Sequence, residues 1–130
     1  MTEYVGIWRD EEGLTKGIEE IYRLRKESET VKAHGTSQYN PAWSECIDLN
    51  AMLTVAEAVA RSARMRQESR GAHSRVDFQG EREEWGNYNI IVRRAEDGSM
   101  EIERLQRGED PAELAKIAKA TLEDLEAGRV

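Results

Sequence analysis

The sequence predicts a mainly α-helical fold, in which an antiparallel helical bundle carries an added β-hairpin and a C-terminal helix. Apolar residues recur at steps of three and four over 11–27, 41–70 and 111–127, which is the period of an amphipathic helix. Apolar and polar residues alternate over 87–105, which is the period of a strand. The length of 130 residues suits a single domain over 1–130.

The first helix is predicted over 11–27. Asp10 suits its N-cap, because a short carboxylate can accept from the free N–H groups of the first turn, and two acids follow it. Gly13 and Gly17 lower the helix propensity at this end, so either the first turn frays or a neighbour packs closely against it. The expected buried stripe consists of Leu14, Ile18, Ile21 and Leu24.

The second helix is predicted over 41–70. Asn40 and Pro41 suit the N-cap and the first helical position, and Gly71 suits the end, since glycine adopts a left-handed conformation without a steric clash. Its apolar stripe is so wide that more than one neighbouring element must cover it. The stripe consists of Trp43, Cys46, Ile47, Met52, Leu53, Val55, Ala56, Val59, Ala63 and Met65.

The remaining elements follow from turn and cap signals. Asp97 and Gly98 predict a tight turn within the hairpin, whose strands need the helices to cover one face because an isolated hairpin is marginally stable. Asp110 and Pro111 predict the start of the C-terminal helix and Gly128 its end. Its expected buried stripe consists of Leu114, Ile117, Ala118, Thr121, Leu122 and Leu125.

The most distinctive motif is the run from Glu68 to Phe78, which reads ESRGAHSRVDF and is followed by Trp85. Together with the opening residues 3–9 and the helical segment 49–57, it resembles the C-terminal helical domain of the succinate dehydrogenase and fumarate reductase flavoprotein family. The resemblance covers about residues 3–105. The proline that commonly follows the Asp-Phe pair in that family is missing here, which puts the shape of the local turn in question.

The resemblance implies a parent enzyme that is an FAD-dependent oxidoreductase acting on CH–CH groups. Such a parent interconverts succinate and fumarate and passes electrons to an iron–sulfur subunit. Its FAD and catalytic residues would belong to domains that precede this one, so we expect the chain alone to be inactive and to hold no cofactor. The expected partners are the flavin-binding domain of the same parent and the iron–sulfur subunit. The alternatives are the C-terminal domain of L-aspartate oxidase or a related flavin enzyme, or a free-standing helical interaction module.

Two interpretations apply to the charged residues of the motif. In the first, the loop satisfies itself, with an arginine holding Asp77 or Glu68 and His73 bonded to a backbone carbonyl. In the second, which the resemblance favours, the side chains face a neighbouring domain or subunit and are exposed in this chain. The residues of the predicted interface are Arg70, Gly71, His73, Arg75, Asp77 and Trp85.

Other site chemistries have little support. The net charge of −7 argues against nucleic-acid binding, and no glycine-rich phosphate loop is present. His34, Cys46 and His73 lack the spacing that places two metal ligands on one helix face, so we predict neither a metal site nor a catalytic site. No apolar run approaches the ~20 residues that span a bilayer. We expect a cytoplasmic location without direct membrane insertion, where attachment to the inner face of the cell membrane would come through partner subunits.

Overall fold

The computed structural model describes residues 1–128. The mainly α class is confirmed, with helices dominating and the strands of the described chain forming two small two-stranded sheets. In order, the elements are β1 (Trp8–Arg9), α1 (Glu11–Ser28), α2 (Pro41–Met65), β2 (Ser74–Arg75), α3 (Glu83–Gly86), β3 (Tyr88–Arg94), β4 (Met100–Gln106), α4 (Ala112–Lys119) and α5 (Leu122–Glu126).

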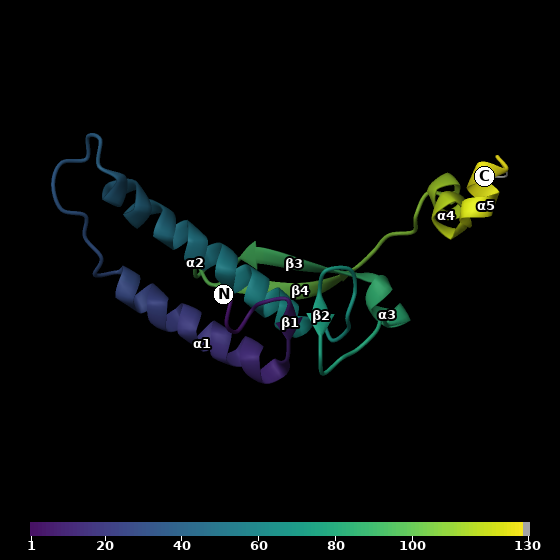
Figure 1. Ribbon diagram of the computed structural model, residues 1–130, viewed down its shortest axis with the longest axis horizontal. Helices are drawn as coiled ribbons and strands as arrows, with labels where there is room; N and C mark the ends of the chain where they lie inside the picture. The colour runs from purple at the N-terminus through teal and green to yellow at the C-terminus, as the bar shows by residue number, and fades with distance from the viewer. Residues whose placement is uncertain (129–130) are drawn as a thin grey trace.

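The core lies between α1 and α2, which run side by side in opposite directions (Figure 1). Three of the four expected α1 residues are buried there, whereas Leu24 is largely exposed. Small side chains on α2 allow the two helices to approach closely, and Ala60 has no exposed surface. The buried core consists of Val5, Leu14, Ile18, Ile21, Leu53, Ala60 and Ala63.

The start of α1 is held by its cap and by the N-terminal segment. The carboxylate of Asp10 accepts a hydrogen bond from the backbone N–H of Gly13 at 2.6 Å, which confirms the predicted N-cap. A Cβ atom on Gly17 would lie 2.9 Å from Cγ2 of Val5 and 3.0 Å from Cβ of Tyr4. Close packing, not fraying, therefore accounts for a glycine at this position, because a larger side chain would push the N-terminal segment off the helix.

The end of α2 differs from the prediction. The helix stops at Met65 instead of continuing to residue 70, and Arg66 already has an extended backbone. Gly71, at φ +57°, lies in the turn that joins Arg70 to His73 through reciprocal backbone hydrogen bonds of 2.9 and 3.0 Å. The last carbonyls of a helix need hydrogen-bond donors. Those of Ala63 and Arg64 in α2 receive them from the side chain of Arg75, so the helix can end early.

The hairpin packs beside α2 with antiparallel register from Tyr88↔Gln106 to Arg94↔Met100. Its connection is looser than the predicted tight turn. The amide of Gly98 donates to the carbonyl of Ala95, and that of Ala95 to the carbonyl of Ser99, each at 2.9 Å. Only Gly98, at φ +85°, has a left-handed backbone within this connection. A turn followed by one left-handed residue is the usual geometry of a three-residue hairpin loop.

The C-terminal segment is the largest departure. The helix predicted over 111–127 is divided into α4 and α5, because Ala120 is extended and the hydroxyl and carboxylate of Thr121 and Asp124 cap a new helix. Asp110 accepts from Arg107 and does not cap α4. Both helices lie apart from α1 and α2 (Figure 1), and the expected buried stripe is mostly exposed. The expected bundle is thus a helical pair, while Gly128 does end α5 at φ +64°.

We predict that Gly98→Val lowers the free energy of unfolding by about 1–3 kcal/mol, because a β-branched side chain is strained at positive φ. Gly108→Val is the matched control, since its added side chain meets no atom within 4 Å and its backbone is not left-handed. Urea unfolding of both variants measures the difference. Equal midpoints for the two variants would contradict the assigned turn.

Candidate functional site

The candidate site is the motif loop, which we define as residues 66–82, between α2 and α3. The loop returns to the start of the chain through β1 and β2, which pair in parallel with Trp8 opposite Ser74 and Arg9 opposite Arg75. The amide of Val76 continues this pairing by donating to the carbonyl of Arg9 at 2.9 Å. The loop is therefore joined to the segment that leads into α1.

Arg75 occupies the centre of the loop and is only 1% exposed. Its Nε and Nη2 atoms each lie 2.7 Å from the carboxylate of Asp77. Nη1 donates to the carbonyls of Ala63 and Arg64 at 3.1 Å, and Nη2 also lies 3.2 Å from the carboxylate of Glu11. Every N–H group of the guanidinium is thus matched to an acceptor. Arg75 joins the end of α2 to the start of α1.

Asp77 is the second member of this network. Its Oδ2 accepts from the backbone N–H of Glu11 at 2.9 Å, in the first turn of α1, where a carboxylate is electrostatically favoured. The hydrogen bonds from Arg75 lower the pKa of Asp77 to about 2, against a smaller opposing effect of burial. The carboxylate therefore remains charged down to strongly acidic pH.

Glu68 is the centre of a second network, with the charges reversed. Its side chain has no exposed surface and accepts from Arg66 at 2.6 Å, from Nε of Arg70 at 2.9 Å and from the amide of Arg82 at 2.8 Å. Burial alone would raise the pKa of Glu68, but the hydrogen bonds from Arg70, Arg82 and Arg66 together lower it to about 2. The anion fixes the two ends of the motif loop to one point.

His73 lies between two arginines. Its Nδ1 is 2.8 Å from Nη1 of Arg9, which can only donate, and its Nε2 is 3.2 Å from the carbonyl of Arg66, which can only accept. The ring is therefore neutral with its hydrogen on Nε2. Burial and the positive charges of Arg9, Arg75 and Arg66 lower the pKa of His73, which favours the same neutral form.

Trp85, on α3, is also largely buried. The guanidinium carbons of Arg66 and Arg104 lie 5.3 and 5.1 Å from the centre of its ring, so the ring contacts two cations. Arg66 thereby joins the ring to the Glu68 network. The tryptophan anchors α3 to the motif loop.

These contacts bear on whether the charged motif residues are satisfied within the chain or face a neighbouring domain. The expectation that Arg75 is exposed for a partner is wrong, because the chain itself supplies all of its acceptors. Gly71 and Asp77 are more exposed than Arg75, whereas Arg70 and His73 are half-buried. Contact between the predicted interface residues and a neighbouring domain stays a prediction.

Several members of the two networks have no signal in the sequence that would assign them to the site. Glu11 is predicted only as an acid in the first turn of α1, and Arg66 lies outside the motif run from Glu68 to Phe78. Arg9 and Arg82 carry no local pattern that would relate them to residues 68–73. The pairing of β1 with β2 brings Arg9 to the site, and a parallel pair of two residues leaves no alternation to detect.

A second feature is an uncovered apolar face on α2. The face consists of Ile47, Met52, Val55 and Val59, whose exposed fractions lie between 41% and 66%. At 100° per residue these side chains turn away from the buried Leu53 and Ala60. The predicted wide stripe is real, but within the described residues only one part of it is covered.

The apolar face leads to a groove of about 470 Å³ beside the motif loop. The groove is lined by the apolar side chains of Ala58, Val59, Ala63 and Ile90 and by the polar side chains of Arg9, Ser62, Arg66 and His73. Exposed apolar surface with a polar border is typical of an interaction site. The motif residue His73 thus lies at one end of the exposed apolar surface.

Neither a metal site nor a membrane span emerges from residues 1–128. No group of three His, Cys, Asp or Glu side chains in this part of the chain is arranged to hold a metal ion. None of the helices described is both long and apolar enough to cross a bilayer.

An uncovered apolar face beside a complete core is typical of a surface that contacts another protein or domain. The family model of the fumarate reductase flavoprotein C-terminus matches residues 1–124. The chain therefore belongs to the C-terminal domain family of succinate dehydrogenase and fumarate reductase flavoproteins, as the motif predicted.

Individual relatives agree with this assignment. The fumarate reductase flavoprotein subunit of Mycobacterium tuberculosis is 37% identical over 98 residues, which is 75% of this chain and 17% of that protein. The succinate dehydrogenase flavoprotein subunit of Coxiella burnetii is 32% identical over 114 residues, which is 85% of this chain and 19% of that protein. The chain thus spans less than a fifth of the length of these relatives.

A solved structure has the same fold. The Escherichia coli quinol fumarate reductase superposes with a TM-score of 0.75 and 32% sequence identity, covering 82% of this chain and 19% of that one.

We predict that Arg75→Ala destabilises the 130-residue chain by about 3–5 kcal/mol, because it leaves Asp77 without its buried partner and exposes two helix carbonyls. Arg93→Ala is the control, since Arg93 forms only a surface ion pair with Glu103 and should change stability by about 0.5 kcal/mol or less. Urea unfolding monitored by circular dichroism tests both. Similar small losses for the two variants would show that Arg75 is not buried in solution.

Acid should destabilise the chain through the same networks. The pKa values of Glu68 and Asp77 in the folded chain are about 2, below their ordinary values of 4.5 and 3.8. At pH values between the folded and the ordinary pKa, the unfolded chain therefore binds more protons than the folded chain. Their stabilisation is complete above about pH 5 and is lost as the pH falls towards about 2. Glu68→Gln should make the decline of the urea midpoint shallower, and Glu83→Gln, outside the network, should not. An unchanged slope in Glu68→Gln would count against the buried anion.

Proposed function

We propose that this chain is the C-terminal docking domain of a flavoprotein that interconverts succinate and fumarate. The uncovered apolar face of α2 carries this proposal, because a domain whose core is already complete retains such a face for a partner. The named relatives are flavoprotein subunits of succinate dehydrogenase and fumarate reductase, which favours this parent over L-aspartate oxidase.

The proposed occupant of the apolar face is the flavin-binding domain of the same parent protein. The relatives are more than five times as long as the stretch that this chain matches in them, so most of a parent of that length would lie outside the matched segment. FAD would be held by that other part, and the reaction would take place there. The present chain contributes a rigid surface, because its charged motif is satisfied internally and costs no reorganisation on docking.

The border of the apolar face suits the same partner. Arg9, Arg66 and His73 line the groove beside Val59, and Arg70 and Gly71 lie further along the motif loop. The arginines among these residues can donate to carbonyls or carboxylates at the rim of an interface while the aliphatic residues fill its centre. We propose that the iron–sulfur subunit joins the same assembly, and that attachment to the inner face of the cell membrane comes through such subunits.

A domain exchange tests this proposal. The C-terminal domain of the E. coli quinol fumarate reductase flavoprotein subunit would be replaced by the present chain, and the assembled complex assayed for bound FAD and fumarate reduction. We expect the chimera to retain flavin and activity. A chimera that folds but releases its flavin would contradict the proposed docking role.

Within the chimera, Val55→Glu should lower flavin retention by about tenfold, because it places a charge at the centre of an apolar interface. Val31→Glu is the matched control, since Val31 is similarly exposed but lies in the loop after α1. In the 130-residue chain alone, neither substitution should change the melting temperature appreciably, as both side chains are exposed. Equal flavin retention in the two chimeric variants would exclude the α2 face as the contact.

A further inference from the structure

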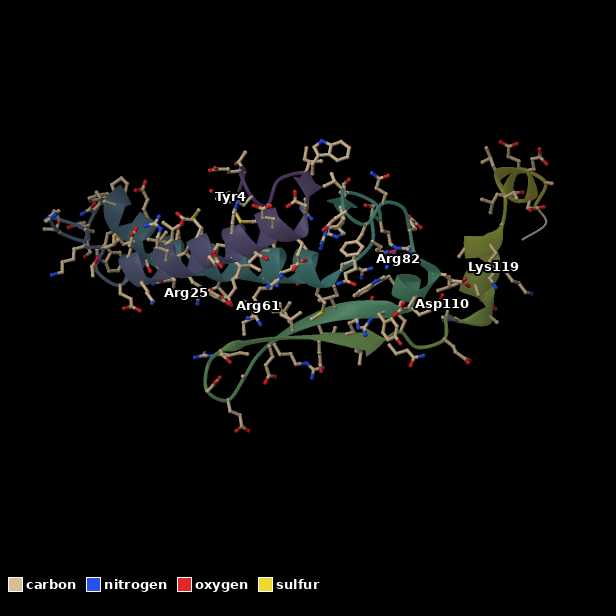
Figure 2. The ribbon with its side chains drawn as sticks, turned by 90° about the horizontal axis from the view of Figure 1, so that it is seen from below. Tyr4, Arg25, Arg61, Arg82, Asp110 and Lys119 are labelled. Carbon is tan, nitrogen blue, oxygen red and sulfur yellow. The ribbon has the colours of Figure 1, made fainter. Side chains whose placement is uncertain are left out.

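A cleft of about 670 Å³ lies between the helical pair and the hairpin. Its walls come from α1, α2, β3 and β4, and Arg25 and Arg61 lie close together on the edge of the helical pair that faces the hairpin (Figure 2). The residues of α2 that line it, Thr54, Glu57 and Arg61, are different from those of the apolar face. The cleft is therefore separate from the proposed docking surface.

The cleft is positively charged within an acidic chain. Its lining includes the arginines Arg25, Arg61 and Arg94 but a single acid, Glu57, which is 5% exposed. Glu57 accepts from Arg61 at 2.9 Å and lies 2.9 Å from Nη2 of Arg25. A fourth arginine of the lining, Arg93, is neutralised by Glu103. One carboxylate cannot balance the remaining three guanidinium groups, although the chain as a whole has a net charge of −7.

Several of these donors have no acceptor. The Nε atom of Arg25 is buried without a hydrogen-bond partner, and its Nη2 atom, although at ion-pair distance from Glu57, makes no well-directed hydrogen bond to it. The side chain of Arg94 is exposed and forms no hydrogen bond or ion pair within residues 1–128. Buried donors in proteins almost always have an acceptor. The buried Nε of Arg25 and the free guanidinium of Arg94 leave the cleft with more donors than acceptors.

We propose that this cleft binds a small organic anion that carries carboxylate or phosphate groups. A guanidinium presents its N–H groups in a planar fork that matches both kinds of group. The hydroxyl of Ser99 supplies a further donor, whereas those of Tyr22 and Thr54 already donate to Glu57 and to the carbonyl of Asn50. Val92 and Met100 give the wall an apolar part. The volume falls within the range of roughly 300–1,000 Å³ typical of small-molecule sites and exceeds the needs of a single inorganic ion.

Arg25 and Arg94 have distinct roles in the proposed site. Arg25 is anchored by Glu57, so the exposed part of its side chain is held in place before the ligand arrives. Arg94 comes from the hairpin on the opposite wall. Its guanidinium lies beside the hairpin turn, since a Cβ atom added to Gly98 would be 3.5 Å from its Nη2. An anion between them would be held from both sides and would join the hairpin to the helices.

Nuclear magnetic resonance of the ¹⁵N-labelled 130-residue chain tests the proposal. Citrate and inorganic phosphate would be titrated separately at constant ionic strength, with sodium chloride as the reference, while the Nε–Hε signals of the arginines are followed. We expect saturable shifts of the Arg25 and Arg94 signals in at least one titration, and the tighter titration distinguishes carboxylate from phosphate. Shifts that stay linear in both, or that match those in sodium chloride, would overturn the proposal.

Arg94→Gln should weaken the binding by about tenfold, the equivalent of one charge-assisted hydrogen bond. Lys26→Gln is the control, because it removes the same charge one residue from Arg25 without lining the cleft. Equal weakening by both substitutions would mean a general charge effect and would also overturn the site. The titration of the unsubstituted chain remains decisive if Arg94→Gln fails to fold. The proposal does not depend on the docking role, since a failed chimera would leave these signals unaffected.

Discussion

The burial of the Arg75 guanidinium is the constraint on which the arrangement of the other segments depends. A buried cation is tolerated only if its N–H groups all meet acceptors, and the acceptors here come from α1, from the end of α2 and from Asp77. The requirement fixes where α2 ends, how the motif loop turns back and where α1 begins. Three segments that are distant in sequence are held by one side chain.

The Glu68 network complements the Arg75 network with the opposite charge. An anion surrounded by Arg66, Arg70 and the amide of Arg82 holds the loop together, while the cation of Arg75 holds the loop to the helices. Because the charged motif is used in this way, the proposed docking role would rest mainly on the apolar face of α2. The loop contacts lie within the chain and do not need a partner to form.

Local patterns in the sequence predict those parts of the fold that depend on local interactions. The apolar period and the carboxylate of Asp10 were sufficient to predict α1, and the alternation was sufficient to predict the hairpin. The end of α2 could not be predicted because its cap, Arg75, lies ten residues beyond Met65. The division of the C-terminal helix does have a signal in the sequence, because Thr121 and Asp124 have the spacing of a capping box. The motif was sufficient to predict where the site lies. The burial of Arg75 could not be predicted, because charged residues are normally exposed.

Hydrogen exchange of the backbone amides tests most directly whether the motif loop belongs to the cooperative core. The amide of Arg75 donates to the hydroxyl of Ser69 at 2.8 Å and that of Val76 to the carbonyl of Arg9 at 2.9 Å, so both should exchange only when the whole chain unfolds. The account predicts protection at these amides equal to that of Leu53 and Ala60 in the centre of α2. Exchange of the loop amides at the rate of a free peptide, with α2 still protected, would contradict it.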